Sequence, residues 1–155
     1  EDVFLYQRST GAVTLVSRSA TSATGTANSQ SIPTAISADG EWVLFQSNAT
    51  DLVSGITDSN GTNEDVFLYQ RSTAAASLVS RSAASAVTTA NAAAFPNAIS
   101  ADGARVLFAS NATNLVPGVL DGNDNTDVFL AHIVDPNRVF ADGFESVPQA
   151  TTAQA

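Results

Sequence analysis

The sequence predicts an all-β fold built from short antiparallel strands. The first observation is an internal repeat, because the ten residues EDVFLYQRST at Glu1 return at Glu64, an offset of 63 residues. The second is the presence of short runs rich in β-branched and aromatic residues, which are typical of strands. The third is that we find no amphipathic segment of normal helix length. Together these observations indicate a repeated all-β architecture.

The repeat divides the chain into two near-identical units and the beginning of a third. Residues 1–62 align with residues 64–125 without a gap, and 41 of these 62 pairs are identical. A third copy begins at Asp127 with DVFLAHIVD, one residue earlier than the offset requires. We therefore divide the repeat region, residues 1–135, into units 1–63 and 64–126 and a partial unit 127–135. Equivalent positions in the units are expected to have equivalent structure.

The first two strands of a unit flank a Thr-Gly turn. The segment DVFLYQRS, residues 2–9, carries apolar side chains on both faces, as expected for a strand that is buried on both sides. Its partner strand is VTLVSRS, residues 13–19. The stretch 20–31, which is rich in Ser, Thr, Ala and Asn, has no clear period and is expected to be a loop.

A second pair of strands follows Pro33. A short strand, TAIS, leads to a hairpin turn at Asp39-Gly40, because Asp-Gly supplies the positive φ that tight turns require. The segment EWVLFQS, residues 41–47, is the strongest strand candidate. The Ala-rich stretch 83–94 has a helix-like composition, but Val87 and two threonines interrupt it and its counterpart is rich in Ser, Thr and Gly. We expect a loop there.

Four short strands in each unit are typical of a β-propeller blade or of a sandwich, and the regular repeat favours the propeller. The segments PTAISADGEWVLFQSNATDLV and EDVFLYQRSTGAVTLVS resemble the TolB-like, WD40-like propeller repeats of bacterial envelope and secreted proteins. The resemblance covers residue 2 to about residue 135 and implies a fold without specifying a function. The matching positions are Ser37, Asp39, Gly40, Phe45, Ser47, Asp65, Val66 and Phe67, and then Ser100, Asp102, Gly103, Phe108, Ser110, Asp127, Val128 and Phe129.

The resemblance also implies how the strands are grouped. The chain would contain about two and a half blades of four antiparallel strands, whereas a closed propeller needs roughly four to eight blades. The chain is therefore expected either to be part of a longer one or to assemble with copies of itself. Residues 136–155 are expected to form a C-terminal segment and tail. The groups are an outer strand pair at 2–17, a whole blade at 33–82 and three strands of another blade at 96–134.

The composition excludes several classes of function. The chain has 15 acidic and six basic residues and a net charge of -9, which argues against nucleic acid as a partner. It has no Cys, so a disulfide framework, a thiol nucleophile and a Cys-type zinc site are excluded. No apolar run approaches the roughly 18 residues of a membrane span. A surface filled with Ser, Thr, Asn and Ala favours an extracellular or periplasmic bacterial protein.

The loops before the DVFL strands are the best candidates for a metal site. Both show Asp-x-Asn at the start and Asp at the strand entry, and alternating oxygen donors in a tight loop suit Ca²⁺. The alternative is that these residues only form turns, because Asp, Asn and Gly are the usual turn residues. The excess negative charge favours Ca²⁺. The expected ligands are Asp58, Asn60 and Asp65 in the first loop and Asp121, Asn123, Asn125 and Asp127 in the second.

The other polar residues are expected to have structural roles. Asp39 and Asp102 sit in hairpin turns, and His132, the only histidine, cannot make a zinc site or a catalytic triad by itself. Arg105 is the counterpart of Trp42, so this position is expected to be exposed or at an edge in at least one unit. We identify no catalytic residue and no organic cofactor site.

Two functions are consistent with these observations. The first is a non-enzymatic, secreted or cell-envelope propeller module, a structural or binding scaffold whose partners are other blades or copies of itself. Strand pairing between the start of one copy and the end of another would then form a ring or a filament. The alternative is a propeller fragment of a larger secreted hydrolase or peptidase whose catalytic domain lies elsewhere.

Overall fold

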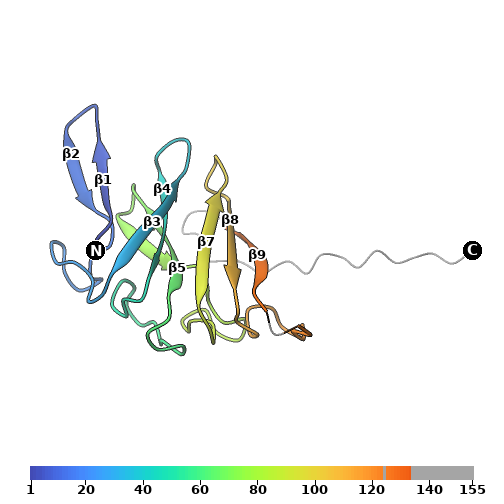
Figure 1. The fold of residues 1–155 in the computed structure, drawn as a ribbon. Helices are drawn as coiled ribbons and strands as arrows, with labels where there is room; N and C mark the ends of the chain where they lie inside the picture. Colours follow the sequence, from blue (N-terminus) through green and yellow to red (C-terminus); the bar gives the residue numbers. More distant parts are fainter. Residues whose placement is uncertain (124, 134–155) are drawn as a thin grey trace, which may run out of the picture.

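A computed structural model of the chain describes residues 1–123 and 125–133. In these residues nine strands form three antiparallel sheets, and there is no helix. The sheets lie side by side in chain order as an open row (Figure 1), and we call them the N-terminal, middle and C-terminal sheets. The all-β prediction is confirmed. The predicted C-terminal segment and tail, 136–155, lies outside the described residues.

Each sheet is built from strands that follow one another in the chain. The order is β1-β2 in the N-terminal sheet, β3-β4-β5-β6 in the middle sheet and β7-β8-β9 in the C-terminal sheet. Sheets of two, four and three strands are the grouping that the repeat predicts. The strands are β1 (Phe4–Gln7), β2 (Ala12–Leu15), β3 (Ser31–Ile36), β4 (Trp42–Ser47), β5 (Asp65–Gln70), β6 (Ala75–Leu78), β7 (Ala94–Ile99), β8 (Arg105–Ser110) and β9 (Asp127–His132).

The third strand of each complete unit is longer than the sequence predicts. β3 begins at Ser31 and β7 at Ala94, so both start before their proline. The pairing with the next strand shifts in register between Pro33 and Ala35, and again between Pro96 and Ala98. A proline has no N–H to donate, and an irregularity of this kind allows it inside a strand.

The hairpin turns form as predicted. Gly40 and Gly103 have φ values of 69° and 72°, a conformation in which glycine has no steric penalty. The Ser37 hydroxyl donates to the Asp39 carboxylate at 2.6 Å, and that carboxylate accepts the backbone N–H of Glu41 at 3.0 Å. The Ser37 hydroxyl contact is the main reason that the pKa of Asp39 is lowered. The predicted turn role of this aspartate is confirmed, and Asp102 makes the same contacts.

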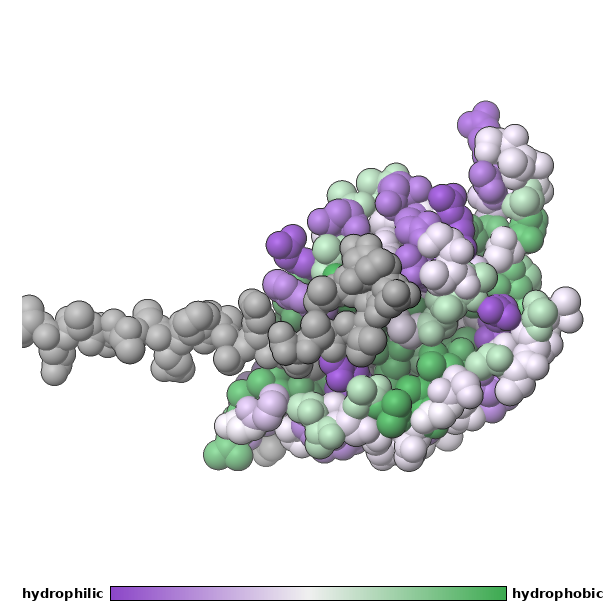
Figure 2. All heavy atoms as spheres, turned by 180° about the vertical axis from the view of Figure 1, so that it is seen from behind, coloured by the Kyte–Doolittle hydropathy of each residue, from purple (hydrophilic) through white to green (hydrophobic). Residues whose placement is uncertain are grey.

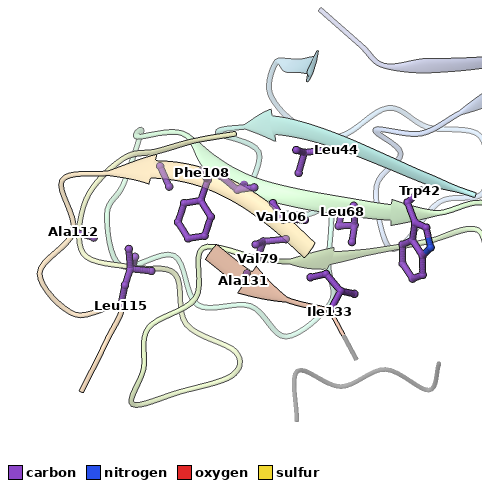
Figure 3. Close-up of a cluster of buried hydrophobic side chains, with 13 residues drawn as sticks. Trp42, Leu44, Leu68, Val79, Val106, Phe108, Ala112, Leu115, Ala131 and Ile133 are labelled. Carbon is purple, nitrogen blue, oxygen red and sulfur yellow. The ribbon is translucent and has the colours of Figure 1, made fainter. Parts of the chain in front are cut away.

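Two hydrophobic clusters hold the row of sheets together. Alternate residues of the middle sheet point to opposite faces, so its two central strands, β4 and β5, contribute to both clusters. One cluster lies between the N-terminal and middle sheets and includes Val3, Val16 and Phe67. The other lies between the middle and C-terminal sheets and includes Leu68, Val106 and Phe108 (Figure 3). The core is therefore located between the sheets.

The loops repeat their contacts as closely as the strands do. The N–H of Ala20 donates to the carbonyl of Asp51 at 2.7 Å, and the N–H of Ala83, the equivalent residue, donates to the carbonyl of Asn114 at 2.8 Å. The Ala-rich stretch before β7 consists of turns and isolated bridges, so the prediction of a loop is confirmed up to residue 93. Ala94, which we assigned to the loop, is the first residue of β7.

Trp42 and Arg105 occupy the same position in two sheets but have opposite environments. Trp42 is buried in the cluster between the middle and C-terminal sheets, whereas Arg105 is exposed. A Cβ added to Gly103 would lie 2.1 Å from Cδ1 of Trp42, so the indole ring packs directly against the hairpin of the C-terminal sheet. The sequence predicts that this position is exposed in at least one unit, and the exposed residue is Arg105, in the C-terminal sheet.

Candidate functional site

The loop before β5 brings the three predicted ligands of the first site together. The Asp58 carboxylate accepts the backbone N–H groups of Asn60 and Gly61 at 3.0 and 2.9 Å. The side-chain amide of Asn60 donates to Asp65 Oδ1 at 3.3 Å and to the carbonyl of Ala92 at 3.1 Å. The Asn60 NH₂ group thus lies between two oxygen acceptors from different segments.

Asp65 is an acidic side chain that is almost completely removed from water. Burial raises the pKa of its carboxyl group to about 7, because a buried carboxylate loses its hydration. The Ser80 hydroxyl, which donates to Asp65 Oδ1 at 2.9 Å, opposes this rise, and the negative charge of Asp58 adds to it. This carboxyl group is therefore expected to lose its proton near neutral pH.

The contact between Asp65 and Ser80 belongs to the structure of the repeat. Ser80 also accepts the backbone N–H of Val66 at 3.0 Å, so it ties the start of β5 to the end of β6. In the N-terminal sheet, Ser17 donates to Asp2 at 3.2 Å and accepts the N–H of Val3 at 2.9 Å. Since the same pair of bonds occurs in both sheets, Asp65 has a clear structural role.

The loop before β9 arranges its predicted ligands differently. Asp121 accepts the backbone N–H of Asn123 at 3.0 Å, and Asn123 Oδ1 accepts the N–H of Asn125 at 3.0 Å. These contacts are successive turns along the chain, with Asn123 and Asn125 exposed. Asp127 pairs in register with Ser110, as Asp65 does with Ser47, so the second loop is one residue shorter than the first.

The first loop fits a cation better than the second does. Asn60 Oδ1 is buried and accepts no hydrogen bond, and an oxygen of this kind is what a Ca²⁺ ion would require. The Oδ1 atoms of Asp58 and Asp65 accept hydrogen bonds within the turn and from the neighbouring strand segment. Within residues 1–123 and 125–133, no group of three or more His, Asp or Glu side chains is placed to hold a metal ion. Calcium binding therefore remains a prediction from the sequence.

A small cavity lies between the N-terminal and middle sheets. It has a volume of about 200 Å³ and is lined by Arg18, Leu52 and Tyr69, among others. The Arg18 guanidinium donates to the carbonyl of Ala74 at 2.6 Å across the gap between the sheets. Pockets that bind small molecules are generally larger, about 300 to 1,000 Å³, so this cavity has the character of a packing defect.

The outer edge of β9 is open in the described part of the chain. β9 occupies the same place as β5, the third of four strands in the middle sheet, and no described strand pairs with it where β6 pairs with β5. Val66 and Asp65 contact Ser80 on the neighbouring strand segment, whereas their counterparts on β9 have no equivalent serine among the described residues. An open edge presents backbone groups to which another strand could bind.

The two ends of the row of sheets expose apolar side chains that are buried in the middle sheet. In the middle sheet Phe67 and Tyr69 have exposed fractions of 3% and 1%, but their counterparts on β1, Phe4 and Tyr6, have 59% and 62%. At the opposite end Val128 and Leu130 of β9 have exposed fractions of 68% and 45%. Their counterparts in the middle sheet, Val66 and Leu68, have 0% and 1%.

These two surfaces are not among the functional sites predicted from the sequence. The signal was present, because a strand with apolar residues on both faces needs a neighbour on each side. Figure 2 shows hydrophobic atoms reaching the surface between hydrophilic ones on the back of the molecule. The two end faces are therefore the strongest candidate binding surfaces in the described residues.

Among the described residues, no helix is long and apolar enough to cross a membrane. Comparison with models of protein families, with curated proteins and with solved structures yields no match.

Proposed function

We propose that the chain is a non-enzymatic, secreted or cell-envelope β-propeller module that acts as a binding scaffold and self-assembles head to tail. In this proposal the three sheets are propeller blades, and the middle sheet is a complete one. The proposal is supported by the resemblance of both units to bacterial propeller repeats. The composition, which is poor in charge and rich in Ser, Thr and Asn, favours the extracellular or envelope location.

The observation that carries the proposal is the difference in strand number between the sheets. In the described residues the middle sheet has four strands, the C-terminal sheet has three and the N-terminal sheet has two. The two sheets with fewer strands lie at opposite ends of the row, so a contact between copies would be heterologous. Such contacts form a ring if the rotation between copies closes and a filament if it does not.

Native mass spectrometry of the 155-residue chain, together with sedimentation velocity at micromolar concentrations, tests the proposal. We expect species larger than the 15.9 kDa monomer, in a closed series of sizes for a ring and in an open series for a filament. A compact, cooperatively unfolding monomer at every concentration would contradict self-assembly. Intact-mass measurement in the same experiment verifies that the chain has not been cleaved.

A further inference from the structure

Each sheet has two different faces, and the cores between the sheets show what covers each of them. We define the N face of a sheet as the one that carries Phe67 and Tyr69 in the middle sheet, and the C face as the one that carries Val66 and Leu68. The N face of the middle sheet packs against the N-terminal sheet, and its C face packs against the C-terminal sheet. Both described interfaces between sheets therefore join a C face to an N face.

The same rule identifies two faces that have no described sheet opposite them. The N face of the N-terminal sheet carries Phe4 and Tyr6 on β1 and, opposite Tyr6 in the register, Val13 on β2. All three side chains are exposed. The C face of the C-terminal sheet carries Val128 and Leu130 on β9, together with Leu107, which is opposite Leu130 on β8. These are also exposed.

We propose that the C face of the C-terminal sheet packs against the N face of the N-terminal sheet of a second copy. This inference rests on the proposed head-to-tail assembly and specifies its interface. The contact would place Val128 and Leu130 of one copy against Phe4 and Tyr6 of the next. Within one chain the equivalent residues already make this kind of contact, since Val3 and Leu5 of β1 pack in the cluster that contains Phe67 and Tyr69.

Face-to-face packing requires less rearrangement than the addition of a strand to the edge of β9. Among the described residues the fourth strand place, which β6 takes beside β5, is unfilled beside β9, whereas the N-terminal sheet is a pair of strands that are hydrogen-bonded to each other over four residues. For β2 alone to take that fourth place, it would have to leave β1. Packing of the two faces leaves every described backbone hydrogen bond in place, and it covers apolar area on both copies at once.

The position of Arg105 fits a second copy as the occupant. Its counterpart Trp42 packs against Gly103 in the hairpin between β7 and β8. The N-terminal sheet consists of β1 and β2, which are the counterparts of β5 and β6 and not of β7 and β8. When the N-terminal sheet of a second copy covers the C face, Arg105 remains in water, where a guanidinium has no desolvation cost.

Glutamate substitutions on one face at a time test the contribution of each face to the contact between copies. The first variant is V128E/L130E on the C face, and the second is F4E/Y6E on the N face. We expect each variant alone to self-associate at least about a hundredfold more weakly than the wild type in sedimentation equilibrium, because buried carboxylates would be left unpaired. I36E is the matched control, because Ile36 is exposed on β3 of the middle sheet and belongs to neither end face.

Mixing the two variants tests the head-to-tail direction. Each variant keeps one intact face, so an equimolar mixture is expected to form a 1:1 dimer that does not grow further. A dimer in the mixture, with monomers in each separate sample, supports the proposal. Self-association of either variant at wild-type strength would overturn the assignment of the faces while leaving self-assembly in place. A wild-type chain that remains monomeric would overturn both proposals.

The fold of the variants is checked by circular dichroism and thermal unfolding. All four substituted side chains are exposed, so the melting temperature of the monomers is expected to stay close to that of I36E. If a glutamate variant does not fold, the milder pair L130A and Y6A is measured in the same way. Wild-type association in both alanine variants would contradict the proposed interface.

Discussion

At the scale of single residues, Asp65 makes the stability of the protein depend on pH. The pKa of its buried carboxyl group, about 7, is higher than the usual value of 3.8. Between these values the folded state keeps a proton that the unfolded state has released. The free energy of unfolding is therefore expected to fall as the pH rises from about 4 to 7, by on the order of a few kcal/mol.

The variant D65N is expected to remove this dependence. An amide oxygen can still accept the hydrogen bonds from Ser80 and Asn60, but it carries no charge that needs hydration. Urea unfolding from pH 5 to 8 should show a flatter profile for D65N and a higher stability than the wild type at pH 8. D2N is the control, because Asp2 makes the same serine contact at a half-buried position. Parallel profiles for wild type and D65N would contradict the role of Asp65.

Calcium is the second prediction at this scale. If Asp58, Asn60 and Asp65 hold one ion and Asp121, Asn123, Asn125 and Asp127 a second, binding to the folded state raises its stability. The gain is about 2.7 kcal/mol per site at a hundred times Kd. We expect excess EDTA to lower the melting temperature and D58N to weaken binding in calorimetry, with D51N as the control outside the predicted set of ligands. No heat on adding Ca²⁺ and no effect of EDTA would exclude the prediction.

At the scale of single elements, the two Ser-Ala-Asp-Gly hairpins have the same backbone conformation but different neighbours. Gly40 and Gly103 both have a positive φ, so alanine is strained at either position. A Cβ on Gly40 would come no closer than 3.9 Å to Ile36, whereas one on Gly103 would overlap Trp42. The difference in stability between the alanine variants at Gly40 and Gly103 therefore measures the contact of Trp42 with the hairpin of the C-terminal sheet.

G40A is expected to destabilise the protein by about 1 to 2 kcal/mol, the cost of the left-handed conformation alone. G103A should cost at least about 1 to 3 kcal/mol more, because the indole must move out of a packed core. Chemical denaturation of both variants measures the difference. Equal losses of stability would mean that Trp42 can move at little cost, and they would contradict tight packing between the middle and C-terminal sheets.

A second element-scale prediction concerns the serine that joins β5 to β6. S80A removes the shorter of the two hydrogen bonds to Asp65 Oδ1, so only the 3.3 Å bond from Asn60 remains, and it leaves the N–H of Val66 without its acceptor. Unsatisfied buried polar groups cost about 1 to 3 kcal/mol each, so a loss of this order is expected in thermal unfolding. S77A is the matched control, because Ser77 makes a single, partly exposed bond to the carbonyl of Leu68. A loss in S80A no larger than that in S77A would contradict this role.

At the scale of the whole molecule, the net charge of -9 opposes any contact between copies. Apolar faces attract each other whereas the charges repel, and salt screens only the repulsion at this range. The Debye length falls from about 30 Å at 0.01 M salt to about 8 Å at 0.15 M. We expect the assembled fraction to increase over this range in sedimentation velocity. Dissociation on adding salt would instead indicate that ion pairs hold the copies together.

Much of the fold follows from the sequence because strand pattern and turn chemistry are local. Alternation with a period of two identifies the strands, and Asp-Gly at positions 39–40 predicts the hairpin between β3 and β4. The repeat then predicts the same elements in the second unit. The start of β3 at Ser31, ahead of Pro33, was not predicted, because a register shift depends on the partner strand.

The candidate sites were less predictable, because their properties depend on what lies opposite each residue. The sequence correctly groups Asp58, Asn60 and Asp65 in one loop, but it does not show that Asp65 is buried against Ser80. Val66 and Val128 are the same residue in the same motif, yet one is buried and the other is exposed. A residue's face is set by its place in the strand, so the sequence alone determines it. Burial is set by the neighbouring sheet, so only the tertiary structure decides which faces remain open to a partner.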